Sequence, residues 1–130
     1  MPLDPEQVKE LKSCYPNLSL VEDGGIGFVL ISPLLLPQGC EPASVDALLC
    51  PFARDGYTSR LFLSARLVHR GPGQNWNADG VVIAGRKWWA VSWKTNQEKL
   101  SLLGMVLAHV QAFNEHHGKD SPRALRKSED

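Results

Sequence analysis

The spacing of hydrophobic residues changes along this chain, and the first spacing is that of a helix. Val8 and Leu11 form a narrow apolar stripe within EQVKELKS, a pattern typical of a short amphipathic helix. Asp4 can cap this helix, and Pro5 suits its first position, where no backbone amide is needed for a hydrogen bond. Pro16 is expected to end the segment.

The middle of the chain has strand patterns separated by turn residues. LSLVED and IGFVLI lie between Leu18 and Ile31 and flank Gly24-Gly25, which predicts a hairpin. SPLLLPQGCEP is expected to be an extended connection, because its prolines cannot pair within a central strand. VDALLCPF (Val45 to Phe52) and RLFLSARLV (Arg60 to Val68) then predict two more strands.

All four tryptophans lie in the next segment, WNADGVVIAGRKWWAVSWKTN. Its second part, residues 80–94, predicts another strand or hairpin, in which Trp89 and Trp93 share a face. We expect that face to be core beneath the last helix. Trp88 is out of phase with it and Trp76 lies in a predicted loop. Both are therefore candidates for an exposed binding surface, because protein interfaces are enriched in tryptophan.

The clearest helical pattern comes near the end of the chain. Thr95-x-x-Glu98 matches a capping box, in which the two side chains satisfy free amides at the start of a helix. Apolar residues then recur at helical spacing, at positions 100, 103, 106, 107, 110 and 113. Gly118 is a typical stop signal, and the residues after it are polar and mixed in charge.

Together these elements predict a single α+β domain over residues 1–117 and a polar, disordered tail over residues 118–130. We expect an N-terminal helix, an antiparallel four-strand meander and a C-terminal helix packed on the sheet. The two helices would cover one face of the sheet and leave the other free, which is a two-layer sandwich.

Composition and charge narrow the classes of partner. The chain has 14 basic and 14 acidic residues and a formal net charge of +0, so no overall field attracts nucleic acid or an anionic membrane. No apolar run approaches the roughly 20 residues that a membrane-spanning helix needs. The charged N-terminus also lacks the apolar stretch of a signal peptide. We therefore expect a cytoplasmic protein that binds neither nucleic acid nor membrane.

The cysteines and histidines do not indicate a metal centre or another cofactor. Cys14, Cys40 and Cys50 are an odd number without CxxC spacing, so we expect reduced thiols. Cys14 and Cys50 are predicted to pack as small hydrophobic residues. His116-His117 have no third ligand nearby in the sequence and suit a solvated helix end. His109 is expected at the boundary of the last helix's apolar stripe.

Three short segments give the chain a resemblance to a known family. LLLPQG (Leu34 to Gly39), VDALLCPFARDGY (Val45 to Tyr57) and RKWWAVSW (Arg86 to Trp93) are followed by a leucine-rich helix. In these features residues 18–115 resemble the prokaryotic E2-like family, which has the ubiquitin-conjugating enzyme (E2, UBC or RWD-like) fold. The resemblance implies the architecture described above. It also implies a bacterial setting, since members of that family occur in operons with ubiquitin-like proteins, E1-like adenylating enzymes and metallopeptidases.

The chain departs from a conventional E2 in its reactive segment. An E2 has a histidine-proline-asparagine motif followed by a catalytic cysteine, which accepts the ubiquitin-like protein as a thioester. Here the loop is VHRGPGQNWNADG, in which His69 and Asn75 are separated, and there is no cysteine from Pro51 to Asp130. Asn75 or Asn77 could take the place of the motif's asparagine, which supports the oxyanion.

The leading hypothesis is therefore an E2-like domain that lacks the usual catalytic cysteine. It would bind a ubiquitin-like protein or an E1-like partner in a bacterial conjugation or antiphage defence system. Trp76, Asn77 and Trp88 are the predicted partner-binding residues, and no cofactor is expected.

Two alternatives stay open. The first is an active, unconventional E2 in which Ser92 forms an oxyester, with His69 as base and Asn75 beside the oxyanion. In another form of this hypothesis the nucleophile is Cys40 or Cys50, both of which precede the expected position. The second alternative is a stand-alone interaction module unrelated to ubiquitin-like proteins.

Overall fold

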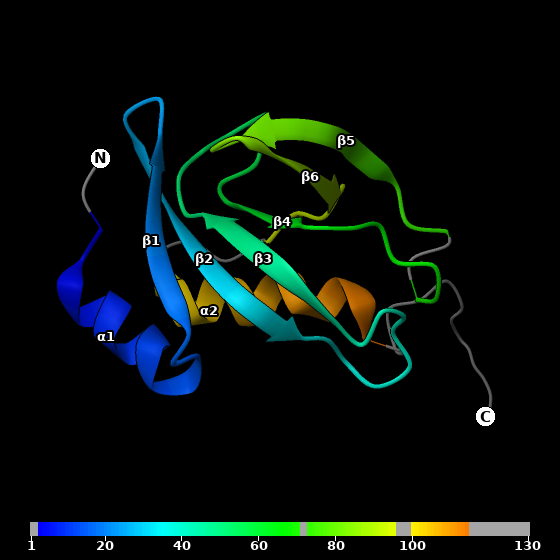
Figure 1. The fold of residues 1–130 in the computed structure, drawn as a ribbon, viewed down its shortest axis with the longest axis horizontal. Helices are drawn as coiled ribbons and strands as arrows, with labels where there is room; N and C mark the ends of the chain where they lie inside the picture. The colour runs from blue at the N-terminus through cyan, green and yellow to red at the C-terminus, as the bar shows by residue number, and fades with distance from the viewer. Residues whose placement is uncertain (1–2, 71–72, 96–99, 115–130) are drawn as a thin grey trace.

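The structure is a computed structural model that describes residues 3–70, 73–95 and 100–114. Within these residues two α-helices, six β-strands and a short 3-10 helix follow one another (Figure 1). Their bounds are α1 Pro5–Cys14, β1 Leu18–Asp23, β2 Ile26–Leu35, β3 Ser44–Cys50, β4 Arg60–Leu63, β5 Trp76–Ile83, β6 Arg86–Val91, α2 Leu102–Val110 and η1 Gln111–Phe113. The chain is thus an α+β protein, as predicted, with its strands between two helices.

The first helix forms where the apolar stripe predicted it. Asp4 caps α1 by accepting a hydrogen bond from the Glu6 amide at 2.9 Å, and Pro5 is its first residue. At the other end, Tyr15 donates its amide to the Leu11 carbonyl. Leu11 is the only residue of α1 that is fully buried, so a single leucine anchors this helix in the core.

The described strands form one antiparallel sheet in the order β1-β2-β3-β4-β6-β5. The predicted hairpin around Gly24-Gly25 is confirmed by the pairing of β1 with β2. However, β2 continues into the segment that was predicted to be a connection. The register with β3 shifts between Ile31 and Leu34, and Pro33 lies within this irregularity, where a missing amide costs no ladder hydrogen bond.

The described residues form six strands where the sequence pattern predicted four. The strand predicted over residues 60–68 ends at Leu63, because the chain then turns away and His69 pairs with Glu41 instead. The tryptophan-rich segment forms the hairpin β5–β6, which begins already at Trp76. This hairpin joins the sheet through a single aligned pair, Leu63 with Trp89.

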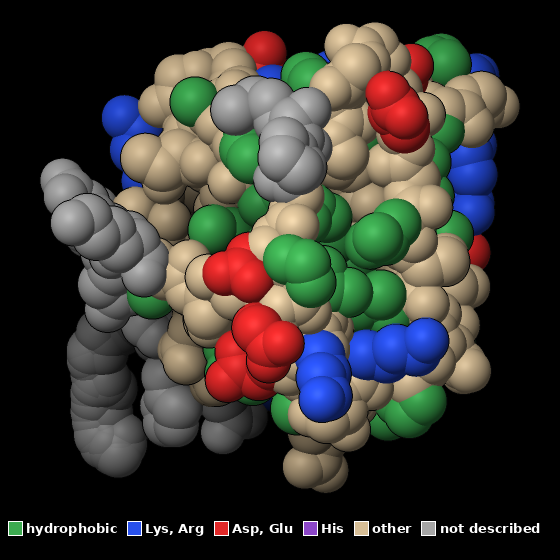
Figure 2. Space-filling view, turned by 90° about the vertical axis from the view of Figure 1, so that its left-hand side faces the viewer, with side chains coloured by type: hydrophobic (Ala, Val, Ile, Leu, Met, Phe, Trp, Pro, Cys, Tyr) green, Lys and Arg blue, Asp and Glu red, His purple; other side chains and the backbone are tan. Residues whose placement is uncertain are grey.

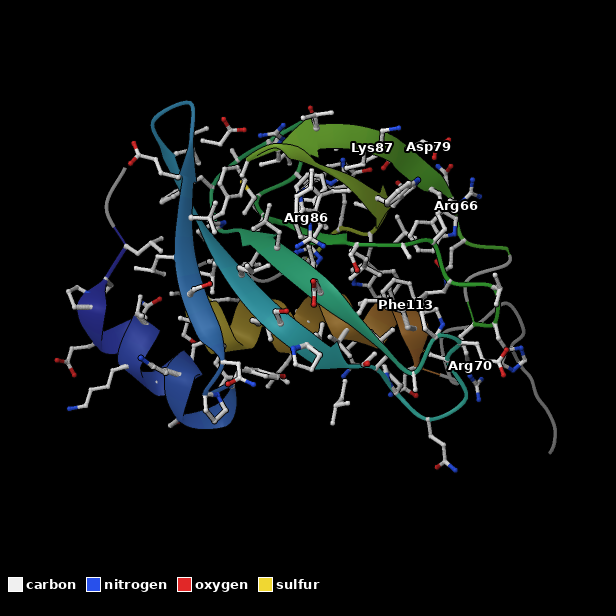
Figure 3. The ribbon with its side chains drawn as sticks, in the orientation of Figure 1. Arg66, Arg70, Asp79, Arg86, Lys87 and Phe113 are labelled. Atoms are coloured by element: carbon white, nitrogen blue, oxygen red, sulfur yellow. The ribbon has the colours of Figure 1, made fainter. Side chains whose placement is uncertain are left out.

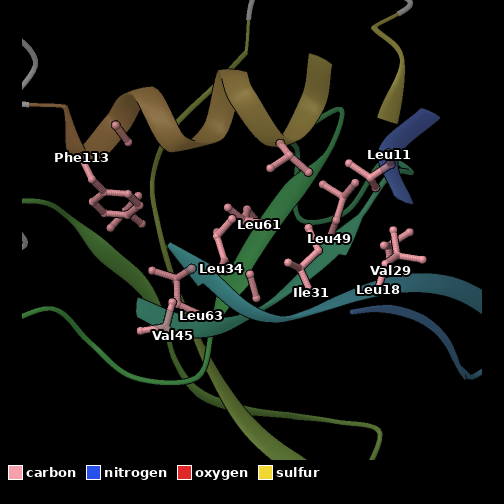
Figure 4. Packing of buried hydrophobic residues seen from close by; sticks show 14 of the residues in the cluster. Leu11, Leu18, Val29, Ile31, Leu34, Val45, Leu49, Leu61, Leu63 and Phe113 are labelled. Atoms are coloured by element: carbon pink, nitrogen blue, oxygen red, sulfur yellow. The ribbon is translucent and has the colours of Figure 1, made fainter. Parts of the chain in front are cut away.

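One hydrophobic core cluster lies between the sheet and the helices (Figure 4). Alternate strand residues point toward α2, as the period of two requires. The strand members are Leu18, Val29, Ile31, Leu34, Val45, Ala47, Leu49, Leu61, Leu63 and Val91. Leu11, Leu102, Val106, Ala112 and Phe113 meet them from the helical side.

A second core cluster fills the opposite face of the sheet, which was predicted to be free. It consists of Phe28, Leu48, Cys50, Phe62, Ala78, Ile83, Trp88 and Ala90. Figure 1 shows β5 and β6 on the other side of β3 and β4 from α2. The two-layer prediction was therefore wrong: the hairpin adds a third layer, and β4 is buried along its whole length between the two clusters.

Two polar contacts also link the hairpin to distant strands. The Ala84 amide, in the β5–β6 turn, donates to the Asp23 carboxylate at 3.1 Å. Arg86, at the start of β6, donates to the Asp46 carboxylate of β3 at 3.1 Å. The turn of the second hairpin is thus fixed above the first hairpin and the centre of the sheet.

The last helix begins later than the capping-box pattern predicted. Ser101 is the N-cap of α2, and its hydroxyl accepts a hydrogen bond from the Gly104 amide at 3.0 Å. Thr95 precedes the helix and does not cap it, while Glu98 lies outside the described residues. The cap is therefore supplied by the serine next to the first helical residue.

A side chain of the first helix completes this end of α2. Gln7 Oε1 accepts a hydrogen bond from the Leu102 amide at 3.1 Å. This bond joins the two helices, which lie near opposite ends of the sequence. The predicted stop at Gly118 and the tail over residues 118–130 lie outside the described residues. Among the described helices, none is long and apolar enough to cross a membrane.

Candidate functional site

A polar cluster forms where the loop after β3 meets the start of β4, the start of β5 and the end of β6. The Tyr57 hydroxyl lies 2.7 Å from Ser92 Oγ and accepts a hydrogen bond from Asn77 Nδ2 at 2.8 Å. Arg60 donates to Asn77 Oδ1 at 2.5 Å. We call Tyr57, Arg60, Asn77 and Ser92 the tyrosine cluster.

Arg60 is 3% exposed, which is unusual because arginine is rarely found inside a protein. Its guanidinium also donates to the Val91 carbonyl at 3.1 Å and to the Asp55 carboxylate at 3.3 Å. The same group lies 4.4 Å from the centroid of the Tyr57 ring. These acceptors and the ring offset the cost of burying the charge, so the cluster is held around a fixed cation.

These surroundings lower the pKa of the Tyr57 phenol. The hydrogen bond with Ser92 is the largest cause, and the bond from Asn77 and the charges of Arg60 and Lys94 act in the same direction, against the effect of burial. Lys94 Nζ lies 6.0 Å from the ring centroid. The phenol therefore gives up its proton more readily than an isolated tyrosine, directly beside a serine hydroxyl.

His109 of α2 lies next to this cluster and is buried, rather than at a helix boundary as predicted. Its Nε2 is 2.9 Å from the Ser59 hydroxyl. Burial, and then the charge of Arg60, lower the pKa of His109 to about 4, while a hydrogen bond with Ser59 acts in the opposite direction. The imidazole is thus neutral near pH 7, and a second cation is not added beside Arg60.

The structure brings together two of the three predicted catalytic residues. The Ser92 amide donates to the Asn75 carbonyl at 2.7 Å, so these residues are neighbours on the two arms of the hairpin. His69 is exposed and bonds through its backbone to Glu41. Tyr57, not His69, is the side chain that contacts the Ser92 hydroxyl in the described structure.

The two cysteines proposed as alternative nucleophiles are both buried. Cys40 donates to the Phe113 carbonyl at 3.7 Å and Cys50 to the Phe52 carbonyl at 3.5 Å. Burial raises the pKa of each thiol, which disfavours the reactive thiolate. Cys50 packs as predicted, whereas the same prediction was wrong for Cys14, which is exposed at the end of α1.

The tryptophans of β6 have the opposite phase to the one predicted. Trp88, expected to be exposed for binding, is 1% exposed and donates its Nε1 to the Ile83 carbonyl at 3.1 Å. Trp89, expected in the core, is only half-buried. The reason is the second core cluster, which buries the face of β6 that points away from the helices. Trp93 does lie under α2, where it donates to the Ala108 carbonyl at 2.9 Å.

Trp76 is the first residue of β5 and not part of a loop. Its ring stacks on Phe113, with 6.1 Å between the ring centroids, and the Arg66 guanidinium lies 5.7 Å from its centroid. Trp76 therefore joins the β5–β6 hairpin to the end of the last helix and keeps only part of its surface exposed.

The side of the hairpin that faces away from the second core cluster forms a polar surface with one aromatic ring. We call it the hairpin outer face, and its residues are Asn77, Asp79, Val82, Lys87 and Trp89. Trp89 Nε1 donates to Asp79 Oδ1 at 2.7 Å, which fixes the indole on this face. Figure 3 shows Lys87 and Asp79 on the hairpin, with Arg66, from the segment after β4, beside Asp79. The tyrosine cluster adjoins this face through Asn77.

Sequence reasoning missed the central roles of Tyr57 and Arg60. In the sequence Tyr57 is only the last residue of a segment that carries the family resemblance, and Arg60 is only the first residue of a predicted strand. One signal was available: DGYTSR places a tyrosine and an arginine three residues apart between two apolar strands. It could not show that Asn77 and Ser92, from another hairpin, complete the cluster.

Within the described residues no group of three or more histidine, cysteine, aspartate or glutamate side chains could hold a metal ion. Comparisons with family models, with characterised proteins and with solved structures found no match for this chain. The class that the fold and the site define is therefore an α+β domain with a partly buried polar cluster.

Proposed function

We propose that this chain is an E2-like domain without the usual catalytic cysteine. It binds a ubiquitin-like protein or an E1-like adenylating enzyme in a bacterial ubiquitin-like conjugation or defence system. Support for the fold assignment comes from the α+β class and from a tryptophan-rich segment that precedes a final helix packed on the sheet, both of which the resemblance implies. The six described strands differ from the four-strand meander that it also implies.

The observation that carries the proposal is the chemistry of the segment from Val68 to Gly80, which stands where a conventional E2 has its histidine-proline-asparagine motif and reactive cysteine. That segment adjoins hydroxyl, amide and phenol groups and has no thiol, because no cysteine follows Cys50 in the chain. Both nearby candidates from earlier in the sequence are buried with raised pKa values. A binding role needs no thiolate and is compatible with this arrangement.

The partner would contact the hairpin outer face and the exposed part of the tyrosine cluster. Asn77 belongs to both, and Trp89 is the aromatic residue of the hairpin outer face. Trp89 replaces Trp88 as the candidate anchor, because Trp88 is inside the second core cluster. A half-buried tryptophan ringed by polar groups is typical of an interface hot spot.

A reconstituted reaction tests this proposal. The protein is incubated with a cognate adenylating enzyme and ubiquitin-like protein and with ATP, and we expect no covalent adduct on non-reducing gels. Binding of the two partners is measured by calorimetry. Trp89→Ala should weaken it by about tenfold or more, whereas Leu107→Ser, at an exposed leucine of α2, should leave it unchanged. Undiminished binding by the Trp89 variant, or no binding by the wild type, would contradict the proposal.

A second candidate function is supported by the 2.7 Å contact between Tyr57 and Ser92. In it, Ser92 Oγ attacks the thioester that joins the ubiquitin-like C-terminus to the adenylating enzyme. A C–O bond forms, the C–S bond breaks, the thiolate leaves on the adenylating enzyme, and the Ser92 proton passes to the ionised Tyr57 oxygen.

The same reaction separates the two functions. An adduct that survives reducing agent, is cleaved by hydroxylamine, and is lost in both Ser92→Ala and Tyr57→Phe would establish the oxyester. An adduct that reducing agent removes and that Cys40→Ala or Cys50→Ala abolishes would point instead to a thiol. Either adduct would overturn the non-catalytic proposal while leaving the fold assignment intact.

A further inference from the structure

A groove lies between α1 and the β1–β2 hairpin, and no residue of the tyrosine cluster lines it. It has a volume of about 600 Å³ and is lined by Leu3, Pro5, Val8, Leu20, Val21, Glu22, Gly25 and Gly27. Figure 2 shows apolar side chains gathered on this side of the molecule, with acidic and basic side chains next to them. The lining is therefore apolar apart from one carboxylate.

One wall of the groove is the free edge of the sheet. β1 is the first strand in the sheet order and pairs only with β2 among the described strands. Figure 1 shows that the upper part of β1 extends past α1 toward the hairpin turn. The outer amides and carbonyls of such an edge are ready to pair with another extended segment.

The side chains of β1 do not protect this edge in the usual way. Leu20, in the middle of β1, is 57% exposed, and natural edges are more often blocked by lysine, proline or a bulge. Gly25 of the turn and Gly27 of β2, which pairs with Glu22, also line the groove and leave it open above the strand. A bound strand would cover Leu20 and fill this space.

The negative charge of the groove indicates which kind of partner would bind there. Glu22 is the one charged residue in the lining, and no ion pair within the described part of the chain uses it. Asp4 and Glu6, which flank Pro5 of the lining, add two exposed carboxylates. Pairing with a second copy of this edge would bring like charges together, whereas a basic side chain would neutralise Glu22.

From this juxtaposition we propose that the groove binds an extended peptide of a partner protein, which adds to β1 as a further strand. The peptide carries apolar side chains for the groove and a lysine or arginine opposite Glu22. This surface is separate from the hairpin outer face, and it does not depend on the function proposed above.

Two synthetic probes test the proposal. One is a ten-residue peptide of alternating valine and threonine with a single central lysine, and the other has glutamate in place of that lysine. Fluorescence anisotropy with the full chain should show the lysine peptide binding about fivefold more tightly, the effect of exchanging one exposed attraction for a repulsion. In NMR spectra the lysine peptide should shift the amide signals of Leu20, Val21 and Glu22.

Variants of the protein make the test specific. Glu22→Lys should reverse the order of the two peptides, a gain that a misfolded variant would not show. Leu20→Ser should weaken both by about fivefold, while the control Leu107→Ser, at a leucine of similar exposure on α2, should change neither. A lysine peptide methylated on alternate backbone nitrogens should lose binding, because it cannot pair with the strand edge.

Three results would overturn the proposal. The first is equal binding of the two peptides to the wild-type protein. The second is amide shifts that avoid β1. The third is a concentration-dependent dimer that Leu20→Ser abolishes, measured by analytical ultracentrifugation, which would assign the groove to a second copy of this chain.

Discussion

At the scale of single residues, the arginine inside the tyrosine cluster sets the constraints on its neighbours. Arg60 takes its acceptors from Asp55 in a loop, Asn77 in β5 and Val91 in β6. Burying this charge costs free energy unless those acceptors offset it. One side chain therefore links three parts of the chain that are distant in the sequence. Burial, and then the charge of Arg60, lower the pKa of His109 and keep its imidazole neutral near pH 7.

His109 therefore predicts how stability depends on pH. The folded pKa of about 4 is below the ordinary value of 6.5, so between these values the unfolded chain binds a proton that the folded chain does not. Stability is full above pH 6.5 and falls as the pH drops toward 4, by up to about 3 kcal/mol.

Urea unfolding of the wild type and of His109→Gln, between pH 7 and pH 4, measures this effect. The glutamine variant should lose most of the slope, because glutamine does not titrate. His69→Gln is the control, since His69 is exposed, and its slope should match that of the wild type. Equal slopes for the wild type and His109→Gln would show that another group causes the loss of stability at acidic pH.

At the scale of elements, the start of α2 shows how a correct pattern can be assigned to the wrong place. Thr95 and Glu98 have the spacing of a capping box, yet Ser101 caps the helix. Gln7 of α1 holds the next amide, so tertiary contact selects this start. A local motif cannot indicate which of two possible caps a distant side chain supports.

Two alanine substitutions separate these caps. Ser101→Ala should lower the free energy of unfolding by about 1 kcal/mol, because the Gly104 amide loses its acceptor. Thr95→Ala should cost less than about 0.5 kcal/mol, since its described hydroxyl contact is exposed and long, 3.4 Å to Thr58. Thermal unfolding followed by circular dichroism gives both values. A larger loss for Thr95→Ala than for Ser101→Ala would restore the capping-box assignment.

At the scale of the whole molecule, the β5–β6 hairpin decides the architecture, because it encloses a second core. The hairpin is fixed by the burial of Trp88 and its neighbours and by two surface contacts, one of which joins Arg86 to Asp46. The two kinds of contact contribute different amounts to the free energy of unfolding. Burying a tryptophan removes a large apolar area from water, whereas an ion pair near the surface contributes little.

We therefore expect Trp88→Ala to destabilise the protein by about 3–5 kcal/mol and to expose the hairpin amides to hydrogen exchange. Arg86→Ala should cost less than about 1 kcal/mol, because the Arg86 and Asp46 side chains are 45% and 30% exposed. Trp89→Ala, on the hairpin outer face, is the matched control for Trp88 and should cost less than the buried position. A loss for Arg86→Ala as large as that for Trp88→Ala would mean that polar contacts, not the second core, hold the hairpin.

The sequence by itself determined the α+β class, the capped first helix, the first hairpin and the helical stripe near the C-terminus. Each of these depends on a helix cap, a turn or a hydrophobic periodicity that lies within a short stretch of the sequence. Only the tertiary structure decided that Trp88 is core and Trp89 is surface, that Arg60 is buried, and that Tyr57 adjoins Ser92. These outcomes follow from a hairpin that covers the second face of the sheet. Alternation tells which side chains share a face, but it does not tell which distant segment will cover that face.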